Sequence, residues 1–107
     1  MFFKFNEDMR KIFNEDIDKH NILAWIIYNA NYQEECNGLK KYQCYVSIRA
    51  ISDDININHA KTHRLLKKLI DDGFISYVKK SKSKHTSSII YADFIAREVN
   101  YYETRLL

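Results

Sequence analysis

Proline is absent from this chain of 107 residues, and glycine occurs only twice, at Gly38 and Gly73. A chain so poor in glycine has no Gly-rich loop of the kind that holds nucleotide phosphates, which excludes an ATPase built on such a loop. HEXXH and CXXC spacings are also missing, and neither His20 nor the eight tyrosines have partners that suggest catalysis. We therefore expect no catalytic residues, no enzyme activity and no cofactor.

Cysteines and long apolar runs are scarce as well. Cys36 and Cys44 are too few for a disulfide framework in a chain of this size; they could pair, but reduced thiols are the preferred interpretation. No apolar run approaches the roughly 20 residues that span a bilayer, and the N-terminal residues lack the pattern of a signal peptide. These absences predict a cytoplasmic protein with no membrane partner.

Positive charge is concentrated in one quarter of the chain. The formal net charge is +3, but residues 59–85 contain eight Lys or Arg and two Asp, a net of +6. The remaining residues contain nine Lys or Arg and twelve Asp or Glu, a net of −3. Such clustering indicates a surface for a polyanion rather than a general aid to solubility.

The apolar pattern predicts one domain over residues 1–107, of class α+β and mostly α. Helical spacing predicts terminal helices at about 6–18 and 94–106, and a buried helix around Trp25. Residues 34–43 are expected to form a loop, and Cys44–Val46 a short strand. The apolar residues near both chain ends would either cover the core or form a two-fold interface, and we expect a homodimer.

Two helices joined by a tight turn are predicted between residues 47 and 73. Ser47 is a good N-cap for the first, whose buried face would carry Ile48, Ile51 and Ile55. Asn58 can cap the second, at about 59–72, and Gly73 suits the left-handed residue that ends a helix. Strands are expected at 74–79 and 87–94, joined by a basic link at 80–86.

The segments SIRAISDDI (47–55) and HRLLKKLIDDGFI (63–75) resemble the winged helix-turn-helix family. The resemblance covers about residues 22–94 and implies a three-helix core with a β-hairpin wing, here with extra terminal helices. In size and composition the chain is similar to small plasmid and phage members, including replication initiators and relaxosome accessory proteins that bind an origin of transfer (the TcpK type). The resemblance implies that double-stranded DNA is a partner, and that a relaxase or a replication protein is a further partner.

The second helix of the motif carries a basic face opposite its apolar one. Residues three and four apart share a helix face, so Asn58, His59, His63 and Arg64 would approach base edges. Arg64 is the best candidate for reading guanine, because its planar fork matches O6 and N7. The residues expected to contact phosphates from this motif are Lys61, Lys67 and Lys68, with Ser47 and Arg49 at the start of the first helix.

The expected wing is at least as basic as the helix. It carries Lys79, Lys80, Lys82, Lys84 and His85 with small residues between them. If about six phosphates are neutralised in all, log K should fall with log salt at a slope near −5. The ordinary alternative is a polar hairpin whose lysines discourage edge pairing, but five cations in seven positions exceed that need.

Other interpretations of the same residues are weaker. His59 and His63 have a metal-ligand spacing that Cys36 and Cys44 could join, but they lie on the predicted DNA face, so we expect no metal. The sequence thus predicts a non-enzymatic, sequence-specific duplex DNA-binding protein of a mobile element, marking an origin of transfer or replication. The alternatives are a transcriptional repressor and a protein-interaction adaptor of a replication or transfer complex.

Overall fold

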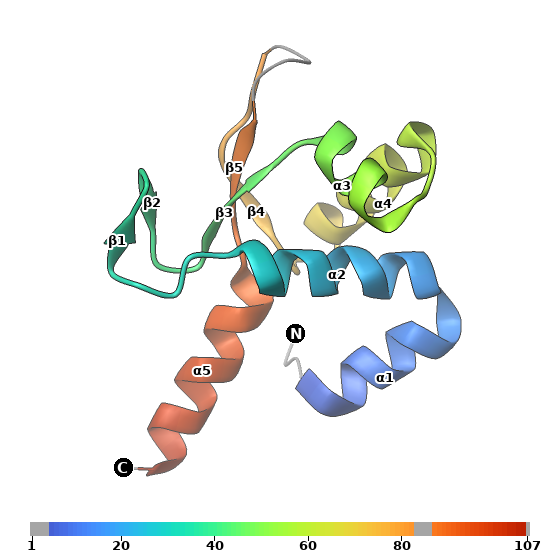
Figure 1. The fold of residues 1–107 in the computed structure, drawn as a ribbon. Coiled ribbons are helices and arrows are strands. Elements are labelled where there is room, and N and C mark those ends of the chain that lie inside the picture. Colours follow the sequence, from blue (N-terminus) through green and yellow to red (C-terminus); the bar gives the residue numbers. More distant parts are fainter. Residues whose placement is uncertain (1–4, 83–86, 107) are drawn as a thin grey trace.

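The structure, a computed structural model, describes the backbone of residues 5–82 and 87–106 and the side chains of residues 7–82 and 87–100. Within these residues it is an α+β fold in which helices predominate, as the sequence predicted (Figure 1). Its elements are α1 (Phe5–Glu15), α2 (Ile17–Asn29), β1 (Glu35–Cys36), β2 (Leu39–Lys40), β3 (Gln43–Val46), α3 (Ile48–Ile55), α4 (His59–Asp71), β4 (Ser76–Lys79), β5 (Ser88–Tyr91) and α5 (Asp93–Leu106).

Asp16 separates the first two helices. Its backbone is extended, with φ −154° and ψ 101°, so the helix cannot continue through it. Its Oδ1 accepts hydrogen bonds from the backbone N–H groups of Asp18 and Lys19, at 3.1 and 3.3 Å. This N-cap satisfies donors that a new helix leaves without partners. The helix expected at about 6–18 therefore ends at Glu15, and residues 17 and 18 belong to α2.

The larger sheet is antiparallel, with β5 between β3 and β4. Cys44 pairs with Ile90, and Val46 with Ser88, so these four residues point to one face of the sheet. We call this the helix-side face, because its buried residues share one apolar core with helix α4. The core members concerned are Cys44, Val46 and Ile90 from the sheet and Leu65, Leu66 and Leu69 from α4.

A second, smaller hairpin occupies the segment that was expected to be a loop. Strands β1 and β2 pair through Glu35 with Lys40 and Cys36 with Leu39. The two linking residues, Asn37 and Gly38, both have positive φ, which is the requirement of a two-residue hairpin turn. The prediction of a loop over 34–43 was therefore wrong in part, because the Asn-Gly pair closes a hairpin.

The helix signals around α3 and α4 are confirmed. Ser47 Oγ accepts from the backbone N–H of Ala50 at 3.0 Å, and Asn58 Oδ1 from that of Lys61 at 2.7 Å. Gly73 follows α4 with φ +80°, a conformation that only glycine adopts cheaply.

The returning strand is shorter than expected. β5 ends at Tyr91, and Phe94 lies in α5 instead of extending the strand to residue 94. The backbone N–H groups of Ile95 and Ala96 already donate to the carbonyl of Ala92, which begins the helix there. Phe94 is fully buried, and its N–H donates to Phe74 O at 2.9 Å, so this residue anchors α5 to the core.

Candidate nucleic-acid interface

Helix α4 presents a basic face to solvent. Thr62, Leu65, Leu66 and Leu69 are buried and fix the opposite face in the core. The exposed residues of the sequence-predicted set on this helix are His59, His63, Arg64, Lys67 and Lys68. Among the residues that the structure describes, Arg64, Lys67 and Lys68 form no ion pair. Their charges are therefore available to an anionic partner.

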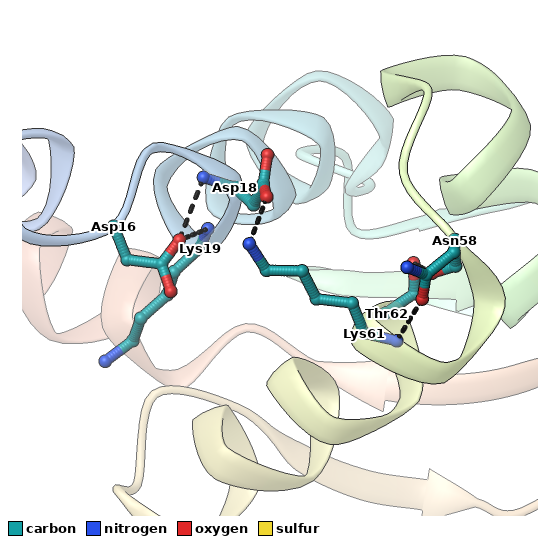
Figure 2. Close-up of polar contacts among 6 residues, drawn as sticks. All are labelled: Asp16, Asp18, Lys19, Asn58, Lys61 and Thr62. Atoms are coloured by element: carbon teal, nitrogen blue, oxygen red, sulfur yellow. Dashed lines mark hydrogen bonds and ion pairs between the residues drawn. The ribbon is translucent and has the colours of Figure 1, made fainter.

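A pair of buried hydroxyl groups joins α4 to α3. Ser52 Oγ donates to Thr62 Oγ1 at 2.7 Å, and Thr62 Oγ1 donates to the carbonyl of Asn58 at 3.0 Å. Both hydroxyl-bearing residues are almost fully buried. Because a buried polar group without a partner is costly, this arrangement favours one placement of the two helices. Figure 2 shows the N-terminal turn of α4, where Asn58 caps the helix beside Thr62.

Lys61 differs from the other lysines of α4. Its Nζ contacts Asp18 Oδ2 at the start of α2, and the two side chains are only about one-third and one-quarter exposed (Figure 2). The sequence predicted a phosphate contact for Lys61, but its ammonium group is held by a carboxylate of the same chain. We therefore leave Lys61 out of the proposed interface and assign it a role in joining α2 to α4.

Two further contacts tie α2 to the helix pair. Lys19 Nζ lies 3.7 Å from Asp72 Oδ2, just after α4, and 5.2 Å from the ring centroid of Phe74. Trp25 Nε1 donates to Asp54 Oδ2 of α3 at 2.7 Å. Helix α2 thus contacts α3 and both ends of α4. These contacts fix the position of α4, and therefore the direction of its exposed face.

The predicted contacts near the start of α3 are already engaged within the chain. Ser47 Oγ serves as the N-cap of α3. Arg49 is highly exposed, but its Nε lies 3.9 Å from Asp53 Oδ2 one turn later. Asn58 is exposed, with its side-chain oxygen used by the cap of α4. An exposed ion pair of this length contributes little free energy, so Arg49 can exchange Asp53 for another anion.

The β4–β5 hairpin carries the second group of cations. Lys79, Lys80 and Lys82 are exposed, and Lys80 Nζ lies 5.5 Å from the ring centroid of Tyr77. Lys84 and His85, also predicted to bind DNA, lie outside the described residues. In Figure 1 the hairpin and the α3–α4 pair are both above α2, whereas α1 and α5 are below it.

The strand register separates the lysines of β4 onto the two faces of the hairpin. Tyr77 pairs with Ile90 on the helix-side face, and Lys79 pairs with Ile89 on the other face. Val78 is the extra residue of a β-bulge between them. Lys80 returns to the face of Tyr77, consistent with its position over that ring. Lys80 is therefore on the side of the sheet where α4 lies, and Lys79 is on the opposite side.

The sequence interpretation missed two residues that contact the predicted cations: Asp18, which contacts Lys61, and Tyr77, which lies under Lys80. Asp18 is 43 residues from Lys61, and no local pattern connects them. Tyr77 lies in the predicted strand beside the lysines, but only the bulge places it next to Lys80. The nearness of Tyr77 to the hairpin lysines in the sequence could have predicted a contact with one of them. The contact of Asp18 with Lys61 could be found only in the tertiary structure.

The cysteines and histidines show no sign of a metal centre in the part of the chain described. No cluster of three or more His, Cys, Asp or Glu side chains suited to a metal ion occurs there. Cys44 is a buried thiol, and burial raises its pKa to about 12. Over the same residues, no helix has the length and apolarity required to cross a bilayer.

Comparison with known proteins gave no similarity to report: no family model, no curated protein and no solved structure matches this chain.

Proposed function

We propose that this chain binds duplex DNA through a basic surface formed by α4 and the β4–β5 hairpin. The basic surface comprises His63, Arg64, Lys67 and Lys68 of α4 with Lys80 and Lys82 of the hairpin; Lys79, on the other face of the sheet, is left out. The observation that carries the proposal is the set of exposed α4 cations without ion-pair partners among the described residues, on a helix whose other face is fixed in the core. A rigid helix with unpaired cations suits the polyanionic surface of DNA.

The order of elements supports assignment to the winged helix-turn-helix fold. After α2 and the small β1–β2 hairpin, the chain continues with β3, the α3–α4 pair and the β4–β5 hairpin, and β3 pairs with β5. In this assignment α4 is the recognition helix and the hairpin is the wing. The assignment explains why cations occur on two separate elements, since both would contact the same duplex.

The dimensions of α4 are compatible with a groove. Its 13 residues span about 20 Å at 1.5 Å per residue, and the major groove of B-DNA is wide enough to admit a helix. In our proposal Arg64, near the middle of the exposed face, donates to guanine O6 and N7. Lys67 and Lys68, one turn further along, contact phosphates and contribute affinity rather than sequence preference.

The biological role that we propose is recognition of an origin of transfer or replication on a mobile element. Support comes from the size and composition, which are similar to those of small plasmid and phage proteins, from the basic segment, and from the resemblance of residues 47–55 and 63–75 to the winged helix-turn-helix family. A second copy of the chain would allow the protein to read two half-sites, because dimers mirror the symmetry of their operators. Relaxase or replication proteins would then assemble on the marked site.

The experiment is selection of preferred duplexes from a random pool, followed by binding measurements with Arg64→Ala. We expect this variant to lose about 1–3 kcal/mol on the selected sequence, to lose less on random duplex, and to relax preference at one base position. Arg10→Ala is the matched control, because Arg10 is exposed on α1, on the other side of α2 (Figure 1). Equal losses on selected and random duplexes would contradict the role of Arg64.

A further inference from the structure

We infer that Tyr77 is a positioning residue that holds Lys80 on the helix-side face of the hairpin, where Lys80 contacts DNA phosphate. The inference rests on the proposed function and goes further by naming a residue outside the predicted site. Tyr77 carries no charge, and no sequence motif points to it. Its place is set by the strand register and by its contact with Lys80.

The contact between these residues depends on a break in strand geometry. In a regular strand, residues three positions apart point to opposite faces, so Tyr77 and Lys80 would not meet. The register changes between Tyr77 and Lys79, which pair with the consecutive residues Ile90 and Ile89. Val78 is therefore an inserted residue, and β-bulges of this kind redirect the side chains that follow them.

The bulge also decides which lysine faces α4. Tyr77 lies opposite the buried residue Ile90, on the helix-side face, and is 42% exposed. With the bulge, Lys79 joins Ile89 on the other face, and Lys80 lies over the ring of Tyr77. Lys80 is therefore the lysine of this pair that lies on the face of the sheet that packs against α4.

The physical effect of the ring is to restrict a flexible cation. A lysine side chain has a large rotamer entropy, which is lost when its ammonium is fixed at a phosphate. The negative face of the Tyr77 ring attracts the ammonium and limits its positions before DNA arrives. An ammonium group has three donors, so a contact with the ring on one side leaves others for phosphate oxygens. Because this contact is already formed in the free protein, its free energy sets an upper limit on the gain, about two- to fivefold in affinity.

The test is a double-mutant cycle between Tyr77 and Lys80, with binding to the selected duplex as the readout. Tyr77→Ile removes the ring but keeps a residue that favours strands. We expect it to weaken binding about two- to fivefold. Tyr77→Phe should bind with wild-type affinity, since the ring face rather than the hydroxyl makes the contact. In a Lys80→Ser background, Tyr77→Ile should have almost no further effect.

Two controls separate positioning from structure. Tyr28→Ile changes another tyrosine, which is 88% exposed on α2, and should not alter binding. Urea unfolding of each variant measures whether the fold keeps its stability. NMR of the free protein detects the contact between the Tyr77 ring and Lys80 in the absence of DNA. The methylene protons next to Lys80 Nζ should show a ring-current shift in wild type and in Tyr77→Phe, and lose it in Tyr77→Ile.

The outcomes distinguish the inference from the proposed function. If the wild-type chain binds no duplex at low salt, the proposed function fails and the inference fails with it. If wild type binds, but Tyr77→Ile binds as well as wild type or loses as much affinity with Lys80→Ser as without it, the inference alone is overturned. Absence of the ring-current shift in wild type would also overturn it.

Discussion

Lys61 and Lys68 lie seven residues apart on α4 and have different surroundings. The ammonium of Lys61 is held by Asp18, whereas Lys68 is exposed and has no ion-pair partner among the residues described. Counting charges along the chain treats these lysines as equivalent. The sequence therefore predicted the basic face of α4 correctly but could not identify the member that is used inside the protein, because the partner lies on another helix.

A second residue, Cys44, predicts how the stability of the protein changes at high pH. Burial raises the pKa of the thiol from its ordinary value near 9 to about 12. Between these pH values the unfolded chain releases a proton that the native chain keeps, so the free energy of unfolding should fall as pH rises. We expect a loss of roughly 1 to 1.5 kcal/mol between pH 8 and pH 10, measured by urea unfolding.

The control for this pH effect is Cys44→Ala, which should show a smaller loss over the same interval. Burial also raises the pKa values of Tyr32 and Tyr91, and these add a decrease in the same direction at higher pH. A thiol reagent at pH 8 should modify the native protein at Cys36 alone. Rapid modification of Cys44 under native conditions would contradict the account of its burial.

At the scale of elements, the sequence predicted helix limits that depend on neighbouring residues, but not the strand limit that depends on a tertiary contact. Ser47, Asn58 and Gly73 act on backbone groups within a few residues, so the limits of α3 and α4 could be predicted from the sequence. The Asn-Gly turn at residues 37–38 and the cap at Asp16 are equally local, but the first predicted only a loop, and the second was placed inside one continuous helix. The early end of β5 could not be read, because it depends on Phe94 packing beside Phe74.

The connection between α3 and α4 provides the prediction at this scale. Thr62→Val keeps the shape of the side chain but leaves the buried Ser52 hydroxyl without its acceptor. We expect this variant to lose about 1–2 kcal/mol of unfolding free energy. Ser52→Ala combined with Thr62→Val should cost less than the sum of the two single changes, because they remove the same hydrogen bond. Additive losses in urea unfolding would mean that the hydroxyl pair does not couple the helices.

At the scale of the whole molecule, α4 and the hairpin, the two elements that carry the cations, lie in the same half. In Figure 1 both elements are above α2, while α1 and α5 extend below it. The sequence indicated this grouping through the net charge of +6 over residues 59–85. It could not indicate which face of the hairpin each lysine occupies, since that depends on the register of β4 with β5 and on the bulge at Val78.

The central claim is that α4 and the hairpin contact the same duplex, and a salt titration tests it most directly. Fluorescence anisotropy would measure the affinity for the selected duplex between about 50 and 300 mM salt. The variants are wild type, Lys67→Ser with Lys68→Ser, and Lys80→Ser with Lys82→Ser. We predict a wild-type slope of log K against log salt near −5, and a flattening of about 2 for each pair. A wild-type slope near zero, or a slope that one of the two pairs leaves unchanged, would contradict the claim.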